Sequence, residues 1–279
     1  MPRSTVCLTF DFDALSVWLA YEKTTPAMLQ RGEYGARVGV PRILAFLEKR
    51  GLAATFFVPG HTVESFPGET EAILEPGHEV AHHSYAHLDP STQSADEERA
   101  DMERAWQVLE RVGVQPLGFR SPSADLSEAT LGLVEELGFL YDSSLMTDDY
   151  RPFHPRIGDR VSRGEPLVRG RESRVWELPL SFELDDWVHF QFNFEPYRKG
   201  GAPPSAVREI WQAEFDWMDE NVDGGILTVC MHPQVIGRGH RMAMLEDFVG
   251  HCLEAGAAFE RMGDVARRLD GEDAVSAAS

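Results

Sequence analysis

Short apolar segments alternate with longer amphipathic segments along most of the chain. Short apolar or alternating runs predict strands at 5–13, 52–60, 78–84, 116–122, 139–144, 173–182, 225–233 and 257–262. Apolar residues at helical spacing predict helices at 40–51, 91–113, 126–138, 204–221 and 241–256. About seven strand–helix units without a break in composition predict a single parallel α/β domain, a regular or a distorted barrel.

Two long segments depart from this pattern and are predicted to be loops of one domain spanning residues 1–270. The first, at about 147–174, contains seven arginines, and the second, at about 181–204, is rich in aromatic residues without a clear period. Loops of this length in compact domains usually act as lids or contact surfaces. The sequence leaves open whether they cover a site or contact another subunit. Residues 271–279 are expected to form a frayed, disordered tail.

The composition of the chain excludes one class of partner. Of 279 residues, 43% are hydrophobic, which is enough for a packed core. The chain has 26 Lys and Arg against 46 Asp and Glu, a net charge of −20. Such a surface repels phosphate backbones, so we expect no nucleic-acid partner. Solubility is the simplest explanation of the acidity.

Cysteine usage and the N-terminus bear on the compartment. Cys7, Cys230 and Cys252 each lie in an apolar stretch without CxxC spacing, which predicts buried free thiols in a reducing compartment. The N-terminal sequence lacks the pattern of a signal peptide, and no apolar run approaches the roughly 18 residues of a membrane span. We expect a cytoplasmic protein that has no membrane partner.

The first predicted strand, TVCLTFDFD, ends in two carboxylates. Asp11 and Asp13 are two positions apart, so an extended chain directs both to one face. Their mutual repulsion is costly unless something offsets it. Other predicted strands run into HHSYAHLDP, RSP, YDSS and MHP. Because chemistry in α/β folds gathers where parallel strands end, these polar groups are expected to form one site.

A metal ion would explain the paired carboxylates. His83 and His87 are four residues apart, so on a helical turn both imidazoles face the same way, whereas His82 would point elsewhere. A divalent cation bound by Asp13, His83 and His87 would neutralise one carboxylate and lower the pKa of bound water towards neutrality. Asp11 would remain free as a base. The alternative is a solvated acidic strand end with an incidental histidine pair.

Two further residues carry candidate roles. Arg120 could pair with Asp11 and hold it ionised, although surface arginines are common. His232 follows an apolar strand and could protonate a leaving group, although a structural histidine is the alternative.

In this order, the motifs TFDFDA, HSYAH, RSP, YDSS and TVCMHP resemble those of the polysaccharide deacetylase superfamily, carbohydrate esterase family 4 and its relatives. YDSS matches only loosely, and the resemblance spans residues 5 to about 262. It implies an irregular (β/α) barrel and a hydrolase of carbon–nitrogen bonds other than peptide bonds. By the resemblance, the catalytic base is Asp11, oriented by Arg120, and the general acid is His232. The implied ligands of one divalent metal ion are Asp13, His83 and His87, with zinc expected first and cobalt, nickel or iron as alternatives.

One departure from the usual motif indicates a branch of the superfamily. Phe12 separates two aspartates that are adjacent in typical chitin and peptidoglycan deacetylases. With EYGARVGVPRIL, WELPLSFELDDW and HPQVIGRGHRM, the chain is similar to the cytoplasmic branch. That branch includes cyclic imide hydrolases, metal-independent allantoinase-like proteins and a protein named as a peptidoglycan deacetylase, and it is often oligomeric.

The branch implies a homo-oligomer that hydrolyses a small amide or cyclic imide. The alternatives are an N-acetyl sugar deacetylase and a non-catalytic or metal-independent relative. A backbone N–H near Ser123 is expected to bind the developing oxyanion. An aromatic cover and flanking side chains are expected from Trp187, Phe190 and Phe192, and from Glu33, Tyr34 and Arg37. The carboxylate partner of His232 is left open among Asp142, Asp185 and Asp186.

Overall fold

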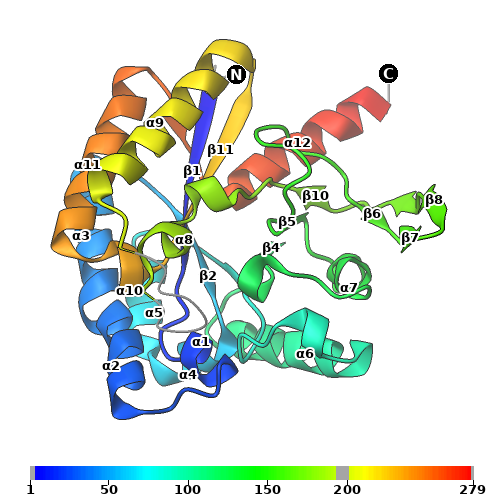
Figure 1. Ribbon diagram of the computed structural model, residues 1–279, viewed down its shortest axis with the longest axis horizontal. Helices are drawn as coiled ribbons and strands as arrows, with labels where there is room; N and C mark the ends of the chain where they lie inside the picture. Colours follow the sequence, from blue (N-terminus) through cyan, green and yellow to red (C-terminus); the bar gives the residue numbers. More distant parts are fainter. Residues whose placement is uncertain (1–3, 193–200, 278–279) are drawn as a thin grey trace.

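The fold is organised around one long buried strand. The computed structural model describes residues 4–192 and 201–277, and the side chains of 272–277 are not described. Strand β1, Ser4–Asp11, pairs along its length with β11, Gly225–Met231, and at its carboxyl end with β2, Thr55–Val58. Figure 1 shows β1 and β11 side by side in the middle of the molecule.

Seven parallel strands form a continuous path in the order β10-β5-β4-β3-β2-β1-β11. The remaining members are β3 (Glu79–His82), β4 (Gly118–Phe119), β5 (Tyr141–Asp142) and β10 (Trp176–Glu177). A short strand, β12 (Ala258–Phe259), pairs with the amino-terminal half of β1. The prediction of an irregular (β/α) barrel of about seven strands is confirmed.

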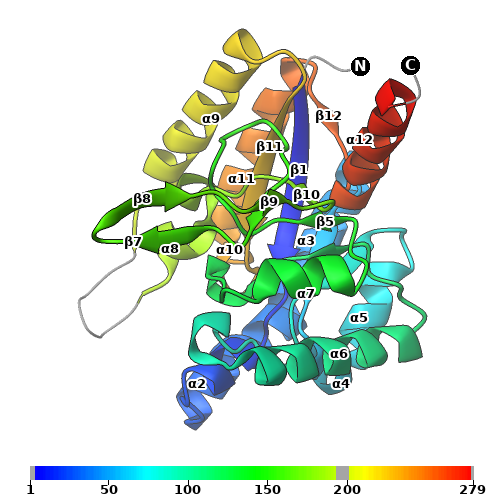
Figure 2. The same ribbon diagram turned by 90° about the vertical axis from the view of Figure 1, so that its right-hand side faces the viewer.

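Helices cover the outer face of this curled sheet (Figure 2). The helices of the described residues are α1 (Ser16–Ala20), α2 (Pro26–Tyr34), α3 (Val40–Arg50), α4 (Gly60–Ser65), α5 (Pro67–Leu74), α6 (Ala95–Arg111), α7 (Thr130–Glu136), α8 (Asp186–Phe190), α9 (Pro204–Asn221), α10 (Pro233–Ile236), α11 (Gly239–Glu254) and α12 (Met262–Ala277). Of these, α12 does not cover the outer face but packs in a second apolar cluster with Cys7 of β1. A π-helical turn, η1 (Gly35–Gly39), joins α2 to α3. The predicted helix at 204–221 coincides with α9.

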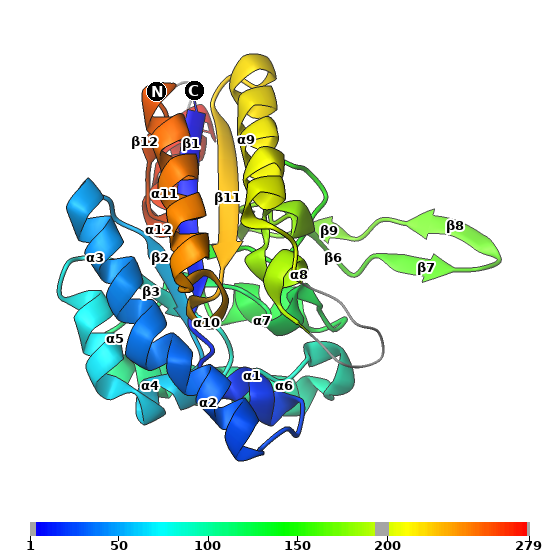
Figure 3. The same cartoon turned by 60° about the vertical axis from the view of Figure 1, so that its left-hand side comes forward.

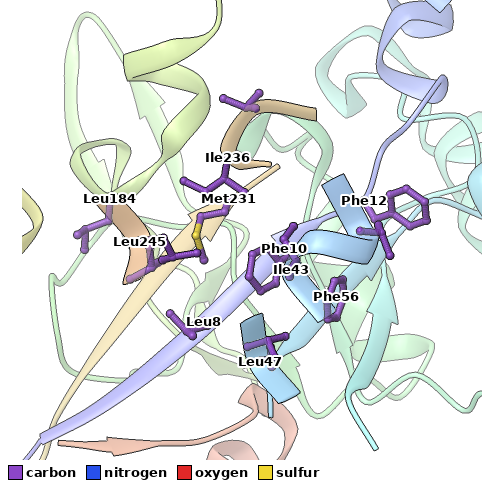
Figure 4. Packing of buried hydrophobic residues seen from close by; sticks show 14 of the residues in the cluster. Leu8, Phe10, Phe12, Ile43, Leu47, Phe56, Leu184, Met231, Ile236 and Leu245 are labelled. Atoms are coloured by element: carbon purple, nitrogen blue, oxygen red, sulfur yellow. The ribbon is translucent and has the colours of Figure 1, made fainter. Parts of the chain in front are cut away.

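Alternation along β1 separates the core from the site. Leu8, Phe10 and Phe12 pack in the layer between the sheet and the helices, together with Ile43 of α3 and Leu245 of α11 (Figure 4). The alternate residues face the interior of the curled sheet, where Cys7 joins a second apolar cluster. Asp11 and Asp13 lie an even number of residues after Cys7. The alternation of the strand therefore directs both carboxylates into the same interior.

The arginine-rich segment is an antiparallel hairpin and not an irregular loop. Strands β6 (Arg156–Ile157) and β9 (Arg171–Glu172) pair at its base, and β7 (Arg160–Ser162) and β8 (Glu165–Val168) pair beyond them. Figure 3 shows it projecting from the body of the protein. The chain reverses at Gly164, between two short runs of alternating character, which explains the hairpin.

Two further segments that were predicted to be irregular, 181–204 and 271–279, also contain regular structure. Part of the predicted loop at 181–204 forms a 3₁₀ turn, η4 (Phe182–Leu184), and helix α8, whereas 193–200 lie outside the described residues. Helix α12 extends to Ala277, so the backbone is helical through most of the predicted frayed tail. The alanines and acidic residues after Gly271 favour helix and contain no breaker.

Within residues 4–192 and 201–277, no helix combines the length and the apolar composition that crossing a bilayer requires.

The close packing of η1 on α10 generates a stability prediction. A Cβ at Gly39 would collide with the carbonyl oxygen of Pro233, the first residue of α10. Gly39→Ala should therefore lower the free energy of unfolding by about 1–3 kcal/mol, as overpacked sites typically do. Urea denaturation measures this. Gly68→Ala in α5 is the matched control, because its Cβ would have no heavy atom within 4 Å, and stability should hold or rise. Equal effects of the two substitutions would contradict the prediction.

Candidate active site

A pocket of about 160 Å³ opens at the carboxyl ends of the strands. Polar groups on its floor come from the ends of β1, β3, β4 and β11, and they are Asp11, Asp13, His83, His87, Arg120 and His232. Its walls include Tyr21, Phe182, Trp187 and Val188. The parallel sheet therefore brings together four of the predicted strand ends.

Asp13 lies at the centre of three imidazoles. Its Oδ1 is 3.5 Å from His83 Nε2 and 3.6 Å from His87 Nε2, and its Oδ2 is 3.9 Å from His232 Nε2. The side chain is fully buried, and Oδ1 has no hydrogen-bond partner within the described residues. Burial alone would raise the pKa of Asp13, but His87, His83 and His232 together lower this pKa to about 2. The Oδ1 of Asp13 is therefore an ionised acceptor without a donor among the described residues.

A hydrogen bond to the backbone fixes the orientation of the His83 ring. Its Nδ1 lies 2.7 Å from the carbonyl oxygen of Arg120, which can only accept, so Nδ1–H donates there. The other ring nitrogen, Nε2, faces Asp13 and is the atom available to a metal ion. Burial lowers the pKa of His87 to about 4, more than the opposing charge of Asp13 raises it, so the ring of His87 is neutral.

These three groups fit a divalent metal ion. Candidate ligand atoms of Asp13, His83 and His87 all lie within 4.8 Å of one another, and all three side chains are buried. Two neutral imidazoles and one carboxylate are a donor set suited to zinc and to similar transition metals. A cation there would give the unpartnered Oδ1 of Asp13 a partner. It would also offset the repulsion between this oxygen and the imidazole nitrogens that face it.

The second carboxylate of β1 is held differently. Arg120 Nη1 donates to Asp11 Oδ1 at 2.7 Å and to Thr9 Oγ1 at 2.9 Å. Its Nε and Nη2 donate to the backbone carbonyl and to the hydroxyl of Ser143, which follows β5. The other oxygen of Asp11, Oδ2, lies 3.9 Å from His83 Nε2. One oxygen of Asp11 is thus fixed, and the other faces the cluster.

His232 is bound to one of its candidate partners. Its Nδ1–H donates to Asp186 Oδ1 at 2.7 Å, and Asp186 also accepts from the backbone N–H of His232. Burial opposes protonation, but Asp186, Asp185 and Asp13 raise the pKa of His232 to about 10. Asp185 is farther from Nδ1, at 3.8 Å, and burial raises the pKa of its carboxyl to about 7. His232 is therefore protonated at neutral pH.

Comparisons with known proteins agree with this geometry. A profile described as polysaccharide deacetylase matches residues 1–141. The chain is 31% identical over 255 residues to the peptidoglycan deacetylase of Helicobacter pylori, covering 86% of this chain and 87% of that one. The chain belongs to the polysaccharide deacetylase family.

Further relatives agree with that assignment. A Gibberella zeae protein named peptidoglycan deacetylase-like protein FGM2 is 29% identical over 92% of this chain and 83% of its own length. The crystal structure of a Mycobacterium smegmatis protein assigned to the polysaccharide deacetylases aligns with a TM-score of 0.85 and 33% identity, covering 98% and 92% of the two chains. The PuuE allantoinase shares the fold at a TM-score of 0.78 and 22% identity, over 95% and 90%. Membership makes this chain a hydrolase of carbon–nitrogen bonds other than peptide bonds.

The local geometry of the two histidines in this deacetylase-family chain differs from the predicted helical turn. His83 and His87 lie on a bend after β3, in which Ser84 and His87 have positive φ values of 58° and 57°. His82 points away, as predicted: its Nε2–H donates to Met102 O, and its Nδ1 accepts from Ser84 N. A left-handed bend, and not i,i+4 spacing on a helix, therefore brings the two rings together.

The predicted surroundings of the site are only partly found there. Ser123, with a φ of 61°, and Trp187 both line the pocket. Tyr34, Glu33 and Arg37 are not among its lining residues, and the Tyr34 hydroxyl instead donates to Gly237 O. Phe190 and Phe192 line a separate cavity. Helix α2 and the π turn place 33–37 against α10, outside the pocket.

Asp142 is excluded as the partner of His232. Its carboxyl lies beside that of Glu177, its register partner on β10, and both are fully buried. Burial raises the pKa of both carboxyls, and the neighbouring charge of Asp142 raises that of Glu177 further. Ser144 and Leu145 donate their backbone N–H groups to Glu177, which fixes the chain beside Ser143 and hence beside Arg120.

Two residues near the carboxylates were not predicted from the sequence. Cys230 Sγ lies 3.5 Å from Asp11 Oδ2 and from Arg120 Nη1, and burial raises the pKa of this thiol. Gln234 Nε2 donates to Asp13 Oδ2 at 3.3 Å. Cys230 and His232 are two positions apart at the end of β11, so they face the same side of the sheet. This alternation could have identified Cys230 from the sequence. No pattern marked Gln234. All three cysteines are free and buried, as predicted.

The donor set predicts how metal affinity depends on single residues. Protein stripped with a chelator should bind one equivalent of zinc, measured by calorimetric titration and elemental analysis. His83→Ala and Asp13→Asn should each weaken binding by more than about 100-fold, since even outer-shell changes cost about 10–100-fold.

His61→Ala is the matched control for that titration. His61 lies on α4, outside the cluster, and its Nδ1 is 3.5 Å from the Ser65 hydroxyl. This variant should bind zinc as the wild type does. Unchanged affinity in His83→Ala would contradict the assignment of the ligands.

Proposed function

We propose that this family member is a metal-dependent enzyme that uses water to hydrolyse a small amide or cyclic imide. One observation carries the proposal: an ionised carboxylate, two imidazoles, a second carboxylate and a protonated imidazole converge on one small pocket. This combination contains a metal-binding set, a proton acceptor and a proton donor, which hydrolysis of a C–N bond requires.

The first proposed role is metal binding, by Asp13, His83 and His87. A divalent cation there supplies Lewis-acid polarisation of the substrate carbonyl and lowers the pKa of coordinated water. Zinc suits the donor set best, with cobalt, nickel or iron as alternatives. Gln234 and the Arg120 carbonyl orient Asp13 and His83 from behind.

Asp11 is the proposed proton acceptor. Arg120 fixes its Oδ1, and Oδ2 faces the space shared with His83. Oδ2 would take one proton from the attacking water as the new C–O bond forms. The buried guanidinium holds Asp11 in one orientation. The backbone beside Ser123, at the mouth of the same pocket, is proposed to donate an N–H to the developing oxyanion.

His232 is the proposed proton donor. Its Nε2 faces the cluster near Asp13, and its Nδ1–H is held by Asp186. The proton on Nε2 would pass to the departing nitrogen as the C–N bond breaks, leaving a neutral imidazole that Asp186 still orients. Each proton therefore has a named origin and destination.

The size and lining of the pocket favour a small, flat substrate. A volume of about 160 Å³ is below the range of about 300–1,000 Å³ typical of sites for drug-sized ligands. Trp187 stands 5.1 Å from the His232 ring and forms one wall, with Val188 and Phe182 beside it. A planar amide or imide ring fits such a slot. The H. pylori relative, named as a peptidoglycan deacetylase, supports the alternative of an N-acetyl sugar.

A substrate panel separates these two possibilities. Zinc-loaded protein should open the rings of succinimide or hydantoin, measured by loss of ultraviolet absorbance. It should release little acetate from chitooligosaccharides under the same conditions. Faster acetate release than ring opening would establish the deacetylase alternative, and no hydrolysis of either class would refute the proposed substrates.

Replacing the base should separate catalysis from metal binding. Asp11→Asn removes the proton acceptor but none of the proposed ligands, so kcat should fall about 10²–10⁴-fold while zinc content is nearly unchanged. Circular dichroism checks the fold, because the substitution leaves Arg120 without its counter-ion. Asp159→Asn on the projecting hairpin is the matched control and should keep full activity. Full activity in Asp11→Asn would refute its role.

We also propose that the enzyme works in the cytoplasm as a homo-oligomer. Three free buried thiols support a reducing compartment. The projecting hairpin exposes Val161, Leu167 and Val168, with Val161 79% exposed, and such side chains suit a subunit contact.

A further inference from the structure

A second cavity, of about 210 Å³, lies next to the active site and shares no lining residue with it among the residues described. Its lining includes Arg31 of α2, Arg238 and Arg241 at the start of α11, Trp18 of α1, Phe190 of α8 and Gln234 of α10. We call it the arginine pocket. Helix α10 packs against both α2 and α8, so segments far apart in sequence enclose the cavity.

The arginine pocket carries positive charge that the described residues do not neutralise. Three guanidiniums line it, whereas no carboxylate does among the described lining residues. Arg238 lies over the Tyr34 ring, 3.5 Å from its centroid, and Arg241 donates to the carbonyls of Val235 and Phe190. The chain has a net charge of −20, so its solubility gives no reason for three arginines to cluster without ion-paired acids.

Buried polar atoms without partners gather on the same side chains. Trp18 Nε1, Arg241 Nε and Gln234 Oε1 are buried and lack a hydrogen-bond partner in the part of the chain described. Trp18 is 3% exposed and Gln234 is 6% exposed. Buried polar groups are normally satisfied, and each exception requires an explanation. Two of these three atoms, Trp18 Nε1 and Arg241 Nε, are N–H donors of residues that line the arginine pocket.

The pocket is built beside the catalytic residues. Gln234 Nε2 donates to Asp13, and the Trp18 ring lies 5.9 Å from that of Trp187, a wall of the active site. Burial raises the pKa of Asp186, and the charge of Arg241 is close enough to oppose that rise. Trp18, Phe190 and the guanidiniums together offer apolar ring faces and cationic forks.

We propose that the arginine pocket is a binding site for a small organic carboxylate with a flat apolar body, separate from the hydrolytic site. The carboxylate would accept N–H bonds from the guanidiniums, and the body would lie against Trp18 and Phe190. Guanidinium forks match carboxylates in geometry, and the aromatic walls favour an organic anion over a fully hydrated inorganic one.

Benzoate is the probe that tests this site. Calorimetric titration of the zinc-loaded enzyme at fixed ionic strength should detect binding. The double variant R31Q/R238Q should raise the Kd of benzoate at least about 10-fold, since two charge-assisted contacts are lost. R163Q, an exposed arginine in the β7–β8 turn, removes the same kind of charge elsewhere and should leave the Kd unchanged. R31Q alone, at a partly exposed position, serves if the double variant misfolds, and should weaken binding several-fold.

Two further ligands distinguish the sources of affinity. Benzyl alcohol, which lacks the charge, should bind at least about 10-fold more weakly than benzoate, since it cannot make the charge-assisted contacts, and inorganic phosphate should also bind more weakly. Benzoate held at the metal site would not depend on Arg31 and Arg238, so an unchanged Kd in the variants would overturn the proposal. Absence of benzoate binding to the wild type, equal binding of benzyl alcohol, or tighter binding of phosphate would overturn it as well.

Discussion

The buried guanidinium of Arg120 holds three parts of the site together. This side chain is 1% exposed, yet it joins β1 through Asp11 and Thr9 to the segment after β5 through Ser143. The carbonyl of the same residue fixes the tautomer of His83. Removing one partner of such a buried pair typically costs about 3–5 kcal/mol, because a charge is left unpaired. The geometry of the proposed base, Asp11, and of one proposed ligand, His83, thus follows from one residue.

Helix α10 links catalysis to the surroundings in a comparable way. His232 caps it, and Asp186 holds this histidine. Gln234 contacts Asp13 on one side and lines the arginine pocket on the other. Gly39 of η1 packs directly on Pro233, the first residue of α10. A four-residue helix therefore sets the position of the proposed proton donor, a neighbour of the proposed metal-binding carboxylate, and the wall between two cavities.

Much of this arrangement is predictable from the sequence because it follows strand parity. Residues of equal parity on a strand share a face, so Asp11 and Asp13 face the interior together. Parallel strands end at one edge, so residues at the ends of β1, β3 and β11 lie near one another. Short motifs at those ends are therefore sufficient to identify the candidates, which are Asp11, Asp13, His83, His87, Arg120 and His232.

Contacts between segments that lack a periodic pattern depend instead on how the whole chain packs. Asp186 and not Asp142 reaches His232, because α8 fills the gap beside β11 while Asp142 pairs with Glu177 on β10. Tyr34 lies outside the pocket, and a left-handed bend brings His83 to His87. The arginine pocket joins five helices whose spacing in sequence carries no signal. Local pattern determines the face that a side chain shares with its strand neighbours, whereas long-range packing selects its partner.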